Sequence, residues 1–226
     1  MDLDPNFIRT GLLTFIALVA SLTVHEFAHA IVADFLGDDT PRSEGRVTLN
    51  PMAHIDPIGT ILIPLMNIFV FHGNFFLFGW GRPVRINTSN FRHRVRDEIA
   101  VSLAGPAANL FMALVGVVIG ALAIPGNPRL AEPLVSLILM NVGLAVFNLL
   151  PIPPLDGGTL LRYATGMSEA TYFMIARWST WVLLVAINLD GFRYWMSVLF
   201  RVACVPYMVV CHWINPTIVP ILFPFF

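Results

Sequence analysis

The stretch "LTVHEFAHAIVADFLG", residues 22–37, decides the fold, because it places two histidines and a glutamate inside an otherwise apolar segment. No residue from 10 to 25 or from 27 to 33 carries a formal charge apart from the histidines, so Glu26 lies deep within an uncharged run. A carboxylate near the centre of a bilayer costs about 2.5–3.5 kcal/mol on insertion scales and by default marks a functional interior. The stretch therefore predicts a membrane-embedded helix that carries a site.

The composition of the whole chain agrees with a membrane protein. It has 226 residues, of which 57% are hydrophobic and 12% charged, whereas a soluble domain carries about 25% charged residues. Residues 99–128 and 133–155 each lack Asp, Glu, Lys and Arg, and each run meets the roughly 20 residues that a crossing helix needs. We predict an all-α polytopic membrane protein, a bundle of five to six membrane segments. Residues 1–226 form one integral-membrane domain, with a core at 7–165 and accessory C-terminal spans at 170–226.

The expected helices follow from the apolar runs and their breakers. Pro5 suits an initial helical turn and Gly37 is a natural stop, so the first helix spans about 5–37. Further spans are predicted at about 98–124, 133–150, 170–189 and 193–214. The proline-broken tail that follows is expected to lie along the membrane. "GVVIG", residues 116–120, predicts a close helix contact inside the bundle.

Two segments between the first and second spans depart from plain helix. Residues 57–81 lack formal charge but are interrupted by Pro57, Pro64, Asn67 and "HGN", which favours a re-entrant hairpin that enters and leaves on one side. "GRVTLN", residues 45–50, alternates apolar and polar residues and predicts a short strand.

Arginines cluster directly before the span at 98. All thirteen basic residues are arginines, and five lie close together: Arg82, Arg85, Arg92, Arg94 and Arg96. The positive-inside bias makes this loop cytoplasmic, which places the site towards the cytoplasmic side of a multi-pass cell-membrane protein. A nucleic-acid partner is not expected, because the cluster is short, adjoins a span and belongs to a chain with a net charge of −1.

His25 and His29 point the same way on a helix, with Glu26 beside them, because positions i and i+4 differ by about 40° in direction. This is the H-E-x-x-H arrangement, in which two imidazoles bind a metal and the carboxylate takes a proton from water. The alternative is a pair of interfacial histidines with a solvated glutamate. A catalytic zinc site usually has three protein ligands, and the best remaining candidate is Asp156.

Asp156 lies in "NLLPIPPLDGG", residues 148–158, where three prolines forbid a regular helix. Unwound backbone at membrane depth is tolerated where protein covers it or where it lines a watery cavity, and a hydrolytic site needs such water. The alternative is an interfacial aspartate that caps the next helix.

These residues resemble the site-2 protease family of intramembrane zinc metalloproteases. The resemblance covers roughly residues 14–165 and rests on HEFAH at 25–29, "SLAGPAANL" at 102–110 and NLLPIPPLDGG at 148–158, in the expected order. It implies one zinc ion per chain, with His25, His29 and Asp156 as ligands and Glu26 as general base and acid. It also implies that Asn148 lies near the scissile carbonyl and that a membrane-associated β-hairpin follows the first helix. We therefore expect a minimal form of the family, without a PDZ or CBS domain.

The expected function is hydrolysis of peptide bonds in transmembrane substrates near the cytoplasmic face, by a zinc-activated water with Glu26 as base. The partners would be the lipid bilayer and single-span membrane proteins or cleaved membrane peptides. Two alternatives stay open: a membrane metal-binding or transport protein, and a catalytically silent helix-binding scaffold of the same fold. The sequence indicates neither a natural substrate nor an oligomeric state.

Three other polar residues have open roles. Asn109 and Asn141 are expected to hydrogen-bond between helices, and Asn141 could instead assist catalysis. His54 either touches the site or is a turn histidine bonded to backbone.

Overall fold

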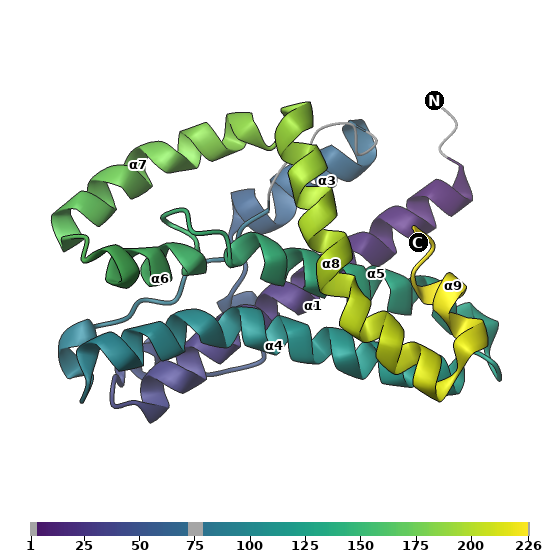
Figure 1. Ribbon diagram of the computed structural model, residues 1–226, viewed down its shortest axis with the longest axis horizontal. Coiled ribbons are helices and arrows are strands. Elements are labelled where there is room, and N and C mark those ends of the chain that lie inside the picture. The colour runs from purple at the N-terminus through teal and green to yellow at the C-terminus, as the bar shows by residue number, and fades with distance from the viewer. Residues whose placement is uncertain (1–3, 72–78, 226) are drawn as a thin grey trace.

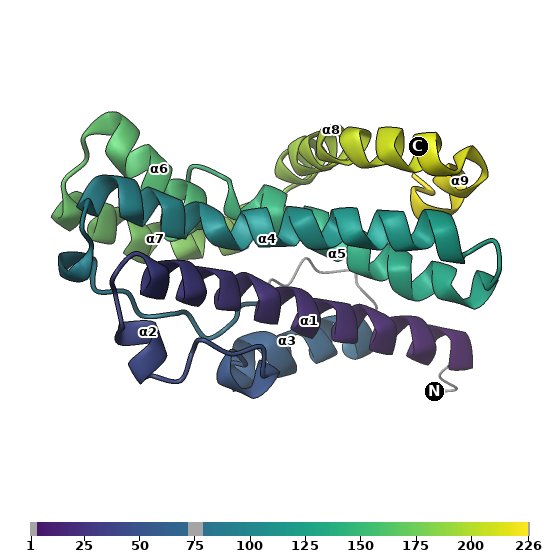
Figure 2. The same cartoon turned by 90° about the horizontal axis from the view of Figure 1, so that it is seen from below.

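Three long helices form the centre of the protein. A computed structural model describes residues 4–71 and 79–225. In it α1 (Pro5–Phe35), α4 (Arg94–Ala123) and α5 (Ala131–Asn148) pack together, and α4 contacts both of the others extensively. Figures 1 and 2 show α1 and α4 running side by side along the longest dimension of the molecule.

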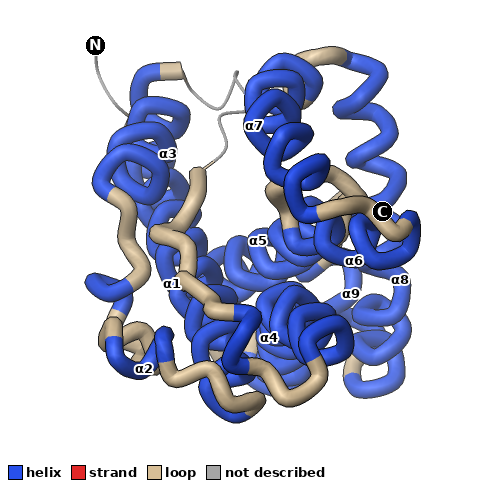
Figure 3. Tube along the Cα trace, turned by 90° about the vertical axis from the view of Figure 1, so that its left-hand side faces the viewer, coloured by secondary structure: helices blue, strands red, loops and turns tan. Residues whose placement is uncertain are grey.

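The remaining helices are shorter or lie at the periphery. They are α2 (Thr40–Ser43), α3 (Ile63–Leu65), α6 (Asp156–Thr165), α7 (Glu169–Ala186), α8 (Asp190–Ile214) and α9 (Val219–Leu222). Two π-helical segments, Pro57–Leu62 and Met66–Val70, flank α3. Single 3-10 turns occupy Pro51–Ala53, Thr88–Asn90, Pro128–Leu130 and Pro216–Ile218. Figure 3 shows helices and loops throughout the described residues, so the all-helical prediction is confirmed there.

The first helix has the predicted bounds. Pro5 occupies its first turn, where the Asp4 side chain accepts a hydrogen bond from the Asn6 N–H. Gly37 follows its end with φ +109°, a left-handed conformation that favours glycine. With 31 residues, α1 is about 45 Å long at 1.5 Å per residue, which exceeds the roughly 30 Å hydrocarbon core of a bilayer.

Four helical segments among the described residues are long and apolar enough to cross a membrane: α1, α4, Pro128–Asn148 and α8. Large apolar side chains on their outer faces, such as Ile16, Phe111 and Val202, are more than half exposed, as suits contact with lipid. The chain is therefore a multi-pass membrane protein. The predicted span at 193–214 corresponds to α8, but the predicted span at 170–189 corresponds to α7, which is not among the four.

The predicted strand at 45–50 was wrong. Gly45 adopts a left-handed turn with φ +69°, the Arg46 N–H donates to the Pro41 carbonyl and the Thr48 N–H donates to the Arg46 carbonyl. These local hydrogen bonds occupy backbone N–H groups that a β-strand would donate to a neighbouring strand. The described residues contain no β-hairpin after α1, because two alternating apolar residues are too short a pattern to override the turns.

The segment at 57–81 returns to its starting point. The Trp80 N–H donates to the Gly59 carbonyl at 3.2 Å, and the Thr60 hydroxyl donates to the Trp80 carbonyl at 2.7 Å. The two ends of the segment therefore lie together, as the predicted re-entrant hairpin requires. Residues 72–78 of that prediction lie outside the described residues.

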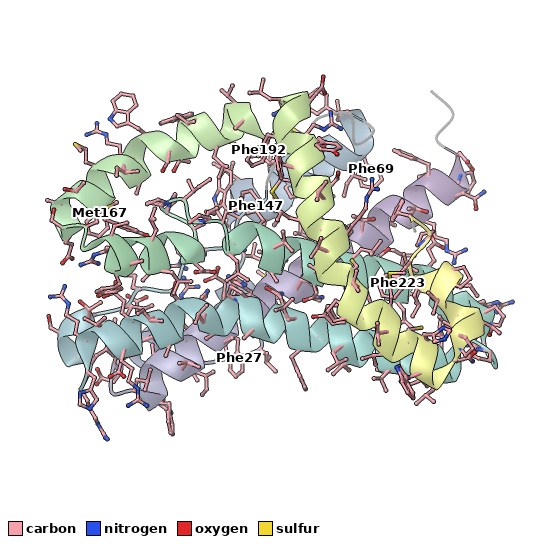
Figure 4. The ribbon with its side chains drawn as sticks, in the orientation of Figure 1. Phe27, Phe69, Phe147, Met167, Phe192 and Phe223 are labelled. Carbon is pink, nitrogen blue, oxygen red and sulfur yellow. The ribbon has the colours of Figure 1, made fainter. Side chains whose placement is uncertain are left out.

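The tail packs on the bundle, and its expected position along the membrane stays a prediction. Ile218, Leu222 and Phe223 are buried in the apolar core formed with α4, α5 and α8, and Figure 4 shows Phe223 beside α8 and the C-terminal helix.

Glycines on α4 allow close contact with neighbouring segments. A Cβ on Gly120 would lie 2.9 Å from Leu222, and one on Gly116 would lie 2.9 Å from Ile138. The predicted close helix contact at 116–120 is confirmed.

Candidate metal centre

Three side chains from two helices converge inside the bundle. His25 and His29 lie one turn apart on α1, and Asp156 is the first residue of α6. The two Nε2 atoms are 3.0 Å apart, His25 Nε2 is 3.2 Å from Asp156 Oδ2, and His29 Nε2 is 3.4 Å from Asp156 Oδ1. Asp156 follows His29 by 127 positions in the sequence. The structure nevertheless brings the three residues that the sequence singled out into a group that could hold a metal ion.

The outer nitrogen of each imidazole faces a hydrogen-bond acceptor. His25 Nδ1 is 2.7 Å from Asn109 Oδ1, and His29 Nδ1 is 2.7 Å from the Val101 carbonyl oxygen. Both Nδ1 atoms therefore donate. When both imidazoles are neutral, their Nε2 lone pairs are directed at one another and at the carboxylate, an arrangement that is repulsive unless a metal ion or a proton lies among them.

The spacing of the cluster fits zinc. Tetrahedral zinc with ligands at about 2.0–2.1 Å places ligand atoms about 3.3–3.4 Å apart, close to the three separations in the structure. Asp156 Oδ2 is buried, and apart from its 3.2 Å contact with His25 Nε2 it has no hydrogen-bond partner among the described residues, as expected of an atom that faces a ligand. Nitrogen and oxygen donors of this kind are the usual ligands of catalytic zinc.

The turn between α5 and α6 places the aspartate. The helix ends at Asn148, and the chain is unwound through its prolines until Asp156, as predicted. A Cβ on Gly157 would lie 2.3 Å from the Leu149 carbonyl oxygen, so only glycine lets α6 begin this close to the turn. The Ser102 hydroxyl donates to the Asp156 carbonyl at 2.6 Å and ties the start of α6 to α4.

A glycine on α4 allows the helix to lie directly against both imidazoles. A Cβ on Gly105 would be 2.4 Å from His29 Nε2 and 2.7 Å from His25 Nε2. One turn later on the same face of α4, Asn109 accepts the hydrogen bond from His25. This small-then-polar pair, four residues apart, was a signal in the sequence that could have identified Asn109 as a partner of the site.

Asn109 belongs to a buried polar network between three helices. Its Nδ2 donates to the Ser21 carbonyl at 3.1 Å and to Asn141 Oδ1 at 2.7 Å, while Asn141 Nδ2 donates to the Ser21 hydroxyl at 2.8 Å. Both asparagines are fully buried. The prediction that they hydrogen-bond between helices is confirmed, and their bonds fix which Asn109 atom faces His25.

Glu26 lies half-buried next to an extended segment. Its Oε2 accepts a hydrogen bond from the Val84 N–H at 3.2 Å, and a Cβ on Gly81 would lie 3.2 Å from Oε1. The sequence could not indicate this contact, or the one from Val101 to His29, because main-chain groups carry no residue-type signal.

Two predicted side chains lie elsewhere. Asn148 Nδ2 donates to the Leu144 carbonyl of its own helix at 3.0 Å, so its role near a scissile carbonyl stays a prediction. His54 is buried, and its Nε2 is 2.8 Å from the Thr48 carbonyl oxygen, which matches a turn histidine bonded to backbone.

The amino-acid sequence is similar to that of proteins named as putative zinc metalloproteases. Residues 127–189 match the model of peptidase family M50, a range that includes Asn148 and Asp156. The chain is 42% identical over 155 residues to "Putative zinc metalloprotease YwhC" of Bacillus subtilis, covering 65% of this chain and 66% of the relative. It is 30% identical over 194 residues to "Putative zinc metalloprotease Rip2" of Mycolicibacterium smegmatis, covering 84% and 72%.

Other relatives match over shorter parts of their length. Against "Putative zinc metalloprotease Rip2" of Mycobacterium tuberculosis the identity is 33% over 145 residues, which cover 64% of this chain and 54% of the relative. The chain thus spans about two thirds of the Bacillus relative and about half of this one. No solved structure shows significant similarity to it. On the family match and these relatives, the chain belongs to peptidase family M50, the site-2 protease family of zinc metalloproteases.

Proposed function

We propose that this chain is an intramembrane zinc metalloprotease that hydrolyses peptide bonds of membrane-spanning substrates at the site formed by His25, Glu26, His29 and Asp156. The observation that carries the proposal is the convergence of two imidazole Nε2 atoms and a carboxylate, all within 4.8 Å of one another, in a bundle of apolar helices. A cluster of lone pairs at this depth is costly unless it binds a cation.

Each residue has a defined part in the proposed mechanism. His25, His29 and Asp156 would hold one zinc ion per chain, with their orientation set by Asn109, Val101 and Ser102. Zinc held there supplies Lewis acidity, which makes water more acidic and a peptide carbonyl more electrophilic. Glu26 takes the proton from the attacking water and delivers it to the leaving amine. Asn148 would contact the scissile carbonyl after its side chain turns away from α5.

The substrates we propose are single-span membrane proteins or membrane peptides left by an earlier cleavage. A substrate helix hides its peptide bonds in its own hydrogen-bond ladder, so it has to unwind before hydrolysis. The arginine-rich segment before α4 supports a site nearer the cytoplasmic face. Residues 7–165 would form the protease core of a single domain, and residues 170–226 would be accessory.

The test is cleavage by the purified protein in detergent against a panel of single-span substrates. We expect the wild type to cleave at least one of them and Glu26→Gln to reduce the rate by more than 10²-fold, since general acid–base catalysis contributes about 10²–10⁴-fold. Equal cleavage by the two would remove Glu26 from the mechanism. Absence of cleavage by the wild type would favour a metal transporter or a silent scaffold.

Metal analysis tests the ligand set separately. His25→Ala and Asp156→Ala should lose zinc, whereas His212→Ala should retain one zinc per chain because His212 is exposed on α8, away from the site. Unchanged zinc content in His25→Ala or Asp156→Ala would contradict the assignment.

A further inference from the structure

Arg46, within the stretch that was predicted to be a strand, is a buried arginine whose guanidinium bonds only to backbone within the described part of the chain. The residue is 3% exposed. It donates to the Ala53 carbonyl, to the Arg82 carbonyl at 3.0 Å and to the Pro83 carbonyl at 2.7 Å. Removing a charged group from water is costly, and these hydrogen bonds offset that cost while joining two segments of the chain.

Two of the three carbonyls that Arg46 holds, those of residues 82 and 83, belong to the segment that touches Glu26. The next residue, Val84, donates its N–H to Glu26 Oε2, and Gly81 lies against Glu26 Oε1. On the other side, the Arg82 N–H donates to the His54 carbonyl at 2.8 Å. Residues 81–84 are therefore fixed between the 46–54 loop and the carboxylate.

Electrostatics also connect Arg46 with Glu26. Burial lowers the pKa of the Arg46 guanidinium and the neighbouring Arg82 lowers it further, while the carboxylates of Glu26 and Glu44 act in the opposite direction. The positive charge is thus close enough to interact with Glu26, although the ion pairs of the described residues include none between these two side chains.

We propose that Arg46 is a positioning residue for catalysis: by holding the carbonyls of residues 82 and 83, it keeps the Val84 N–H on the Glu26 carboxylate. This inference rests on the proposed role of Glu26 as base. A general base has to be within hydrogen-bond reach of the proton that it removes, and a misplacement of about 1 Å can cost about 10²-fold in rate. Glycine at 81 and the main-chain donor at 84 hold the carboxylate from two sides.

The kinetic test compares substitutions of the buried Arg46 with a substitution of the exposed Arg85. We expect Arg46→Gln to lower kcat about 10- to 100-fold with KM and zinc content unchanged, and Arg46→Lys to recover part of the loss. Arg85→Gln is the matched control, because Arg85 lies on the same segment but its side chain is 81% exposed. Unchanged kcat in Arg46→Gln, or a loss that only follows lost zinc, would overturn the proposal.

A second pair of variants covers the possibility that Arg46→Gln does not fold. Val84→Pro removes the N–H that bonds Glu26, so its kcat should fall, whereas the kcat of Arg85→Gln should stay near wild type because that side chain is exposed. In a Glu26→Asp background, which keeps a carboxylate, Arg46→Gln should cost much less than in the wild type, because residues that act through one another are not additive. Fully additive losses would contradict action through Glu26.

Hydrogen exchange supplies a readout that does not depend on cleavage. The amides of residues 82 and 84 should exchange faster in Arg46→Gln, with no change in α8. Equal exchange in the two proteins would overturn the inference, whereas a wild type that cleaves no substrate would overturn the proposed function instead. The two proposals therefore fail by different observations.

Discussion

The helices around the site are held by close packing, whereas α7, which follows α6 in the chain, is held mainly by polar contacts. Around the site, α4 packs closely on α1 and α5, and glycines allow backbone to touch side-chain nitrogen and oxygen. By contrast, none of the residues of α7 is fully buried, and the helix has no extensive contact with another helix of the described chain. Figure 1 shows it arching clear of α4.

Polar contacts at two places hold α7. Glu169 accepts from Arg94 at 2.8 Å and lies 3.4 Å from Arg162, and the Ser179 hydroxyl donates to the Pro153 carbonyl. Half-exposed ion pairs contribute little, about 0–1 kcal/mol, whereas a close-packed interior responds to a single methyl group. Substitutions near the site should therefore change zinc binding and cleavage strongly, whereas substitutions on α7 should change cleavage and stability little.

The largest effect is expected from a methyl group added to α4. Gly105→Ala places Cβ where it would meet both Nε2 atoms, so zinc content should fall at least tenfold and cleavage should fall with it. Gly191→Ala on α8 is the control, because a Cβ there would meet no atom of residues 4–71 or 79–225 within 4 Å. Full zinc content in Gly105→Ala, measured by elemental analysis, would show that α4 can withdraw from the imidazoles.

The next effect concerns the orientation of His25. Asn109→Ala removes the acceptor of its Nδ1–H, and loss of such an outer partner typically lowers metal affinity 10- to 100-fold. The measurement is zinc affinity by competition with a chelator. Asn188→Ala is the control, because Asn188 follows α7 and its side-chain amide donates to the nearby Leu184 carbonyl; equal affinities in the two variants would contradict the assignment.

A smaller effect concerns the loop beyond α1 and depends on pH. Burial disfavours the charged carboxylate of Asp38, but hydrogen bonds from Thr40, Asn87 and Asn90 outweigh it and lower its pKa. The stabilisation is therefore complete above the ordinary pKa of about 3.9 and is lost as the pH falls through the lowered value. Asp38→Asn should be less stable than wild type at pH 6 by about 1 kcal/mol.

Thermal unfolding in detergent at a series of pH values checks this prediction. The difference in Tm between wild type and Asp38→Asn should narrow as the pH falls below about 4. A difference that stays constant from pH 6 to pH 3 would show that ionised Asp38 does not stabilise the loop.

The smallest effect is expected on α7. Glu169→Gln removes two contacts with arginines, but its side chain is 50% exposed, so cleavage and Tm should change little. Activity within about twofold of wild type at low salt is the expected result. A loss comparable to that of Asn109→Ala would show that the position of α7 is coupled to the site.

The sequence predicted the helices and the convergence of His25, His29 and Asp156 because their signals are strong and local. Long uncharged runs, a spacing of four residues and prolines before an aspartate each constrain the backbone. The strand at 45–50 failed because two alternating apolar residues are a weak pattern, and turn bonds from Gly45 onwards satisfied the backbone. The packing of the tail on the bundle was not predicted, because hydropathy does not distinguish lipid from a protein core.

Contacts to main-chain atoms were the least predictable part of the site. The partner of Glu26 is an N–H of residue 84 and that of His29 is a carbonyl of residue 101, and any residue except proline offers the same N–H. Arg46 was visible as a basic residue between turns, but its three acceptors come from two segments that only the fold brings together.

Leu222 and Phe223 fill the space between α4, α5 and α8, and they are synthesised after all three of those helices. The ribosome therefore delivers every crossing segment before the residues that close the bundle interior. Until then the glycine face of α4 is open to lipid or to a chaperone. A nascent chain arrested before residue 218 should be more sensitive to protease than one arrested well beyond 223.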